Sequence, residues 1–72
     1  MMVKITNAGP LDLASLVPGD MLVFTALREP EIAIFIAKDE DWKKWCTCLF
    51  IKDSRPLFMR VSIDTLARPS ID

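Results

Sequence analysis

The chain lacks histidine, tyrosine and glutamine altogether, and it contains only two glycines among its 72 residues. Without histidine it has neither the commonest general base nor the commonest metal ligand, which excludes Ser-His-Asp, Cys-His and histidine-metal sites within one chain. The two glycines, Gly9 and Gly19, form no glycine-rich phosphate loop. We therefore expect no catalytic residue, no metal and no cofactor, and we predict that the protein is not an enzyme.

An excess of charge of either sign is also missing, because the chain has nine basic and ten acidic side chains, which give a net charge of −1. This balance removes the broad positive field that non-specific nucleic-acid binding needs, and it gives copies of the chain little mutual repulsion. Three consecutive carboxylates, at residues 39–41, fall on a predicted loop tip. We interpret them as a solvated charge cluster rather than as a metal or catalytic site.

Long hydrophobic runs are absent as well. The longest uninterrupted one covers residues 32–37, whereas a membrane-spanning helix needs about 20 residues. The first residues carry one lysine but no continuous apolar segment, so we expect no signal peptide, no contact with a membrane and a location in the cytoplasm.

Cysteine is scarce, with Cys46 and Cys48 separated by one residue. In a strand both would point to the same side, where a bridge between them would distort the pleat, so we expect two free thiols. Two thiolates on one face would supply half of a tetrahedral metal site, with a second chain supplying the other half, and redox chemistry is a third alternative. The simplest interpretation is that both are small buried apolar groups.

Strand-forming residues are abundant, since Leu, Ile, Val and Phe account for 23 of the 72 residues. Enrichment in strand-forming residues, divided by turn signals, predicts strands over 21–28, 31–38, 44–52 and 57–63, with centres near Val23, Ile34, Cys48 and Met59. In the second of these, one face holds Ile32, Ile34 and Ile36, and the other holds Ala33, Phe35 and Ala37. Two apolar faces are typical of a central strand or of a strand that also meets a partner.

Shorter elements fill the rest of the chain. Residues 2–6 alternate like a short strand, and residues 7–10 carry a strong turn signal. Residues 11–17 are ambiguous between a helical turn started by Asp12 and an irregular segment, and we expect a second helical turn capped by Asp64, followed by a last strand limited by Pro69. No window shows the stripe of an amphipathic helix.

Two short motifs carry a family resemblance. The run Leu-Val-Pro-Gly-Asp-Met-Leu-Val at residues 16–23, and the turn Asp64-Thr65-Leu66 before a last short strand, resemble SH3-like small β-barrels, particularly the short single-barrel proteins encoded by bacteriophages. This implies an all-β fold, a small antiparallel SH3-like barrel of about five strands with a terminal single helical turn. Residues 1–72 would form one domain, with 1–15 as an extension or extra strand and 16–72 as the barrel. The absence of tyrosine departs from the SH3 domains that bind proline-rich peptides.

The segment Trp42-Lys43-Lys44-Trp45 combines aromatic and cationic side chains, and the strand pairing would bring other basic residues near it, namely Lys38, Lys52, Arg55 and Arg60. Such mixtures stack bases and contact phosphates, yet tryptophan anchors protein interfaces equally well. In a purely structural alternative, Trp45 caps the barrel and Trp42 covers its open end. The predicted partner-binding residues are Trp42, Trp45, Lys43, Lys44 and Arg55.

The function that these observations favour is a non-enzymatic interaction module that binds a protein or assembles with copies of itself. The contact would use strand edges and the surface of Trp42 and Trp45, and the resemblance implies a small phage accessory or host-interaction protein located in the host cytoplasm. The alternative is a nucleic-acid or nucleotide binder that uses Lys43, Lys44, Trp45 and Arg55. A variant of this alternative is an oligomeric barrel that holds a nucleotide between arginines, Arg55 or Arg60, of two chains.

Overall fold

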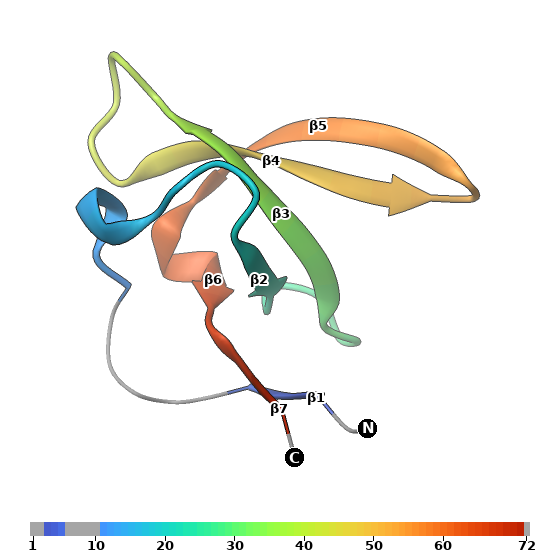
Figure 1. Cartoon of the computed structure of the whole chain (residues 1–72). Coiled ribbons are helices and arrows are strands. Elements are labelled where there is room, and N and C mark those ends of the chain that lie inside the picture. Colours follow the sequence, from blue (N-terminus) through green and yellow to red (C-terminus); the bar gives the residue numbers. More distant parts are fainter. Residues whose placement is uncertain (1–2, 6–10, 72) are drawn as a thin grey trace.

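The computed structural model describes residues 3–5 and 11–71. A five-stranded antiparallel sheet has the order β5-β4-β3-β2-β6, and a separate antiparallel pair joins β1 to β7 (Figure 1). The strands of the large sheet are β2 (Met21–Phe24), β3 (Glu31–Lys38), β4 (Trp45–Lys52), β5 (Arg55–Ser62) and β6 (Leu66–Ala67). The pair consists of β1 (Val3–Ile5) and β7 (Pro69–Ile71), and two 3-10 turns, η1 (Leu13–Ser15) and η2 (Ile63–Thr65), complete the elements.

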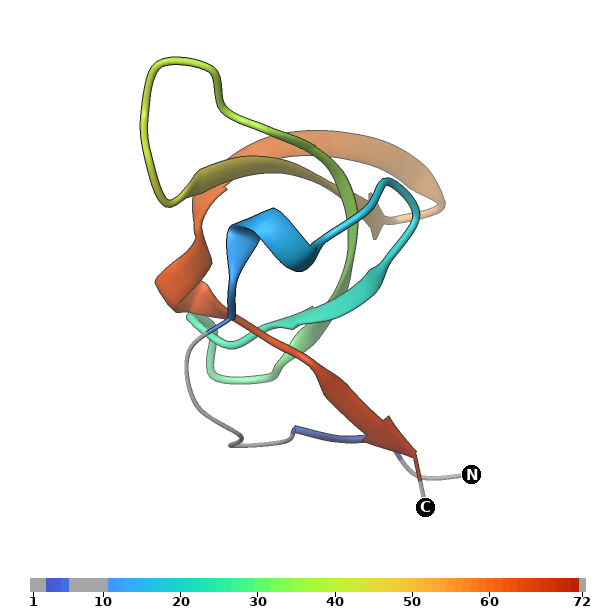
Figure 2. The same cartoon turned by 60° about the vertical axis from the view of Figure 1, so that its left-hand side comes forward.

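The all-β prediction is confirmed, with one antiparallel sheet of five strands. The sheet curls on itself, and η2 carries the chain from the edge strand β5 to the edge strand β6 (Figure 2). This arrangement is compatible with a small SH3-like barrel. No helix in the described part of the chain is long and apolar enough to cross a membrane.

Strand β3 forms over the predicted residues 31–38, whereas the other three predicted strands form with shifted ends. Strand β2 ends at Phe24, short of the predicted end at residue 28, and the backbone N–H of the next residue, Thr25, donates to the carbonyl of Thr65 at 2.7 Å. Strand β5 begins at Arg55, two residues before the predicted start, and Pro56 lies opposite Ile51 in the ladder. Proline is tolerated there because β5 is an edge strand.

Two tight turns define the path of the sheet. The N–H of Asp20 donates to the carbonyl of Val17 at 3.0 Å, and Gly19 between them has a φ of 96°, which is typical of a type II turn with proline and glycine at its centre. At the other end of the sheet, Asp53 and Ser54 join β4 to β5 with φ values of 51° and 63°. Two consecutive left-handed residues form the type I′ turn that suits a two-residue hairpin.

Strand β3 carries a bulge at Ile36. Phe35 lies opposite Cys48 and Ala37 lies opposite Thr47, so two residues of β3 advance against one residue of β4. The extra residue shifts the alternation of the faces. Phe35 shares the inner face with Cys48, whereas Ala37 shares the outer face with Thr47. The prediction that placed Ala37 on the face of Phe35 is wrong for this reason.

The two 3-10 turns are capped by side-chain oxygens. Asp12 caps η1, because its carboxylate accepts from the N–H of Ala14 at 3.0 Å. Of the two alternatives predicted for residues 11–17, the helical turn started by Asp12 is therefore the one that forms. The second turn begins two residues earlier than predicted, and its cap is Ser62, whose hydroxyl accepts from the N–H of Asp64. The predicted Asp64 cap is therefore wrong. Pro69 opens β7 rather than limiting a strand, and the predicted turn at residues 7–10 lies outside the described residues.

The core lies inside the curled sheet. Phe24 and Phe50 meet edge to face there with 5.4 Å between ring centroids, and Leu13 packs against the core. The η1 turn lies over one open end of the curled sheet (Figure 2). The buried side chains of this cluster are Leu16, Leu22, Ala33, Phe35, Cys46, Cys48, Phe50, Val61 and Leu66. Among the described residues, no charged or polar side chain is buried, so the core is entirely apolar.

Candidate protein-binding site

The loop between β3 and β4, residues 39–44, is held in shape by its own hydrogen bonds. The N–H of Asp39 donates to the carbonyl of Trp45 at 2.9 Å, and the N–H of Trp45 donates to the carbonyl of Trp42 at 3.3 Å. The N–H of Asp41 donates to the Asp39 carboxylate at 3.1 Å. Lys44 has a φ of 66°, which turns the chain sharply into β4. These contacts fix both tryptophans relative to the sheet.

Two aromatic rings and one guanidinium meet beside this loop. The rings of Trp42 and Trp45 lie edge to face with 6.1 Å between their centroids, and the Arg60 guanidinium of β5 lies 6.0 Å from the centroid of Trp42. Trp42 is 58% exposed, whereas Trp45 is half-buried. We call these three residues the tryptophan site. They line an open hollow of about 280 Å³, which is large enough for one apolar side chain.

An ion pair holds the arginine of this site in place. Arg60 donates to the Asp39 carboxylate at 2.5 Å, and that carboxylate also accepts from the N–H of Asp41. The hydrogen bond from Asp41 and, less strongly, the contact with Arg60 lower the pKa of Asp39 below 3.8, although partial burial acts in the opposite direction. At neutral pH Asp39 is therefore a carboxylate that orients Arg60 over Trp42.

The structure brings only part of the predicted site together. Trp42 and Trp45 are in contact. Lys43 and Lys44 lie around a different open hollow of about 450 Å³, which they share with Lys38 and with carboxylates. Arg55 lies opposite Lys52 at the far end of the β4–β5 hairpin, seven residues along β4 from Trp45. It therefore takes no part in the tryptophan site.

Arg60 takes the place that the prediction gave to Arg55. The register of the hairpin sets Arg60 opposite Thr47, two residues from Trp45. Arg60 is one of the basic residues that strand pairing was expected to bring near the tryptophans. Counting back from the two-residue turn at Asp53 and Ser54 would have distinguished it from Arg55, since every pair in a regular hairpin is fixed by its turn. The role of Asp39 had no such signal, because it depends on how the loop folds.

The cysteines form no reactive centre. Cys46 and Cys48 are free, fully buried and on the inner face, with their sulfur atoms 3.9 Å apart. Burial, and to a lesser extent the neighbouring thiol, raises the pKa of Cys48 to about 12. Both thiols are therefore protonated at neutral pH, which opposes metal binding and nucleophilic chemistry. Over residues 3–5 and 11–71, no group of three or more metal-ligating side chains of the His, Cys, Asp or Glu type comes together.

No family model, no curated protein and no solved structure matches this chain. The resemblance to bacteriophage barrel proteins therefore gains no support from relatives.

Proposed function

We propose that this chain is a non-enzymatic interaction module whose tryptophan site binds another protein. The observation that carries the proposal is the exposed Trp42 ring, held in one orientation between Trp45 and Arg60. Tryptophan and arginine are the residues most enriched at the energetic centres of protein interfaces, and a side chain that is already fixed loses little conformational entropy on binding.

The distribution of charge favours a protein partner over nucleic acid. The hollow that holds Lys38, Lys43 and Lys44 also contains Asp12, Asp39 and Glu40, so the three positive charges meet three negative ones. Asp39 also pairs with Arg60, so the four cations of this region meet three carboxylates. A phosphate backbone would therefore meet a nearly neutral surface and bind weakly. The apolar faces of the tryptophans do not depend on charge, so they can still bind an apolar side chain of a protein.

The test is the variant Trp42→Ala. Proteins retained from a lysate of the native host by the immobilised wild-type chain are identified, and the affinity of each purified candidate is measured by calorimetry. Loss of a central aromatic anchor costs about 2–4 kcal/mol, so we expect the affinity of the true partner to fall by roughly 30- to 1000-fold. The matched control is Leu27→Ala, in an exposed loop away from the site. Equal affinities of the wild type and Trp42→Ala would refute the proposal.

A nucleic-acid or nucleotide binder is the second candidate, and the three lysines around one hollow are the observation that favours it. Its test is the fluorescence anisotropy of a labelled single-stranded oligonucleotide. Two results together would support this candidate over a protein partner. The logarithm of the binding constant should fall linearly with the logarithm of the salt concentration, and the double variant Lys43→Glu and Lys44→Glu should abolish binding.

The resemblance of residues 16–23 and 64–66 to short barrels encoded by bacteriophages extends the proposal to the biological setting. In that setting the chain is an accessory or host-interaction protein that works in the host cytoplasm.

A further inference from the structure

The outer face of the sheet carries an apolar row that crosses four strands. Met21 lies opposite Ile34, Ile34 lies opposite Leu49, and Leu49 lies opposite Phe58. Residues that are directly opposite each other share a face, so these four side chains form one line across β2, β3, β4 and β5. Met21 and Phe58 are exposed, and the two central residues are half-buried.

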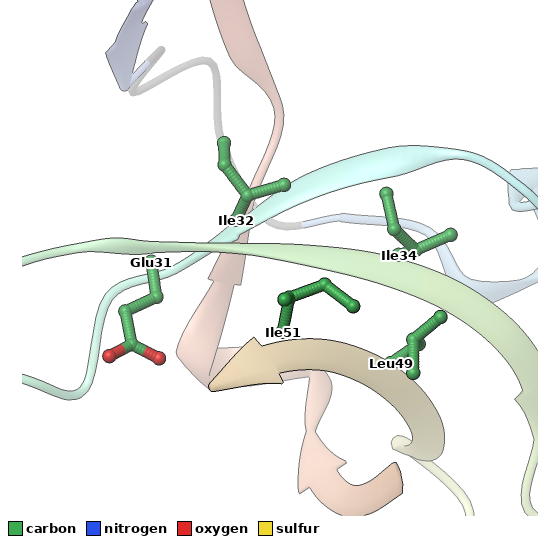
Figure 3. A pocket seen from close by; sticks show the side chains of 5 residues that line it. All are labelled: Glu31, Ile32, Ile34, Leu49 and Ile51. Atoms are coloured by element: carbon green, nitrogen blue, oxygen red, sulfur yellow. The ribbon is translucent and has the colours of Figure 1, made fainter. Parts of the chain in front are cut away.

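A groove runs along the middle of this face. Ile32 and Ile34 of β3 form one wall, and Leu49 and Ile51 of β4 form the other (Figure 3). Its volume is about 420 Å³. A cavity of about 150 Å³ already holds a benzene molecule, so the groove has room for a phenyl ring.

The groove contains no unpaired charge. Glu31 is the one charged residue among those that line it, and its carboxylate accepts from the ammonium group of Lys52 at 2.7 Å. An apolar group can therefore enter without leaving a charge buried and unpaired, which would oppose binding.

The same face also presents an apolar projection. Phe58 is 61% exposed on the edge strand β5, directly beside Leu49 in the wall of the groove. Neighbouring strands lie about 5 Å apart, so Phe58 stands within one to two strand spacings of the centre of the groove.

We propose that this face binds a second copy of the chain, with Phe58 of each copy seated in the groove of the other. A projection and a groove that lie side by side make one surface self-complementary. When two copies are related by a two-fold axis that passes between these features, the projection of each copy meets the groove of the other. The net charge of −1 adds little repulsion between copies. The contacts of this dimer go beyond the proposed function, because they use none of the three residues of the tryptophan site. Arg60 lies two residues from Phe58 on the same face of β5, and the variants that test the dimer leave it unchanged.

Light scattering on chromatographed protein tests the dimer. The wild type is expected to have twice the chain mass of 8.2 kDa at micromolar concentration. The variants Phe58→Glu and Ile51→Lys are each expected to halve the measured mass, and both residues are more than 60% exposed, so neither change disturbs the core. The matched control is Val17→Lys, at a 58% exposed residue outside the groove, which is expected to remain dimeric.

A mixing experiment tests the pairing of projection and groove. When Phe58→Glu and Ile51→Lys are combined, one intact contact remains, and the introduced glutamate faces the introduced lysine across the second. We expect a mixed dimer to reappear at twice the chain mass. A monomeric wild type, a dimer that both single variants leave intact, or a mixture that stays monomeric would each overturn the proposal.

Discussion

At the scale of single residues, Ser54 is one of three described non-glycine residues with a left-handed backbone conformation. It adopts a φ of 63° in the turn between β4 and β5, and Asp53 beside it has a φ of 51°. Left-handed backbone costs an L residue roughly 1–2 kcal/mol, but aspartate tolerates this region better than serine because its side chain bonds to the nearby backbone. The turn therefore forms with a residue that its geometry does not favour.

Replacing Ser54 by glycine is expected to stabilise the fold. Glycine removes the cost of the left-handed conformation and loses part of that gain, about 0.4–1 kcal/mol, through the greater freedom of the unfolded chain. The expected net gain is about 0.5 kcal/mol, or a few degrees in the thermal midpoint of a domain of this size. Calorimetry measures it, with Asp53→Gly as a control that should gain less. A lower midpoint for Ser54→Gly would contradict the assignment of strain to this residue.

At the scale of elements, the loop of residues 39–44 depends on one carboxylate. The pKa of Asp39 is lowered, first by the N–H of Asp41 and then by Arg60, so its charged form is stabilised in the folded chain. A carboxyl group with a lowered folded pKa contributes stability that is fully present above its unfolded pKa of about 4 and is lost as the pH falls through the folded value.

The variant Asp39→Asn tests this dependence. We expect it to be less stable than the wild type at pH 7, and we expect the difference to shrink as the pH falls below 4, since the wild-type carboxylate then takes up its proton. Urea unfolding at neutral and at acidic pH provides the measurement. Glu40→Gln, in the same loop, is the control and should show a smaller change. A difference for Asp39→Asn that is independent of pH would show that the charge has no role in holding the loop.

Most of the strands could be predicted from the sequence, because residues 31–38 and 45–52 are rich in strand-forming side chains and are bounded by turn residues. The bulge at Ile36 could not, since nothing local marks where two strands slip by one residue. The end of β2 at Phe24 could not be predicted either, because residues 25–28 continue the strand-forming composition although the strand stops before them. In the tryptophan site, the sequence indicated the two rings and a nearby arginine, but it did not separate Arg60 from Arg55, and the contact of Asp39 with Arg60 depends on how the loop folds.

At the scale of the whole molecule, the core contains two neutral thiols that titrate only under strongly alkaline conditions. Burial raises the pKa values of Cys46 and Cys48 above 9.0, that of Cys48 to about 12. A group with a raised folded pKa contributes stability that is present below its unfolded pKa, here about 9, and is lost as the pH rises toward the folded value. The fold is therefore expected to weaken between pH 9 and about 12.

Thermal unfolding across this alkaline range tests the prediction. The midpoint of the wild type should fall above pH 9, and that of Cys48→Ala should fall less steeply, because one ionising group has been removed from the core. A thiol reagent at pH 8 provides a second measurement, since the native protein should react only after urea exposes the thiols. Rapid reaction of the native protein would contradict the burial of both sulfur atoms.

Loss of the exposed ring of the tryptophan site should have little effect on the stability of the whole domain. Trp42 is 58% exposed and lies outside the buried cluster, so Trp42→Ala is expected to leave the thermal midpoint within a few degrees, equivalent to less than about 1 kcal/mol. Calorimetry of the purified variant checks this. A much larger loss would mean that the ring supports the loop and that reduced binding by this variant reflects unfolding.

The pairing of β1 with β7 sets how the molecule responds to tension. Val3 lies opposite Ile71 in an antiparallel pair, so a force that pulls the two ends of the chain apart acts along the inter-strand hydrogen bonds and opens them one after another. Such unzipping needs far less force than sliding two strands past each other. A load applied through both ends would peel away this outer pair first, and the five-stranded sheet would bear tension only after it had opened.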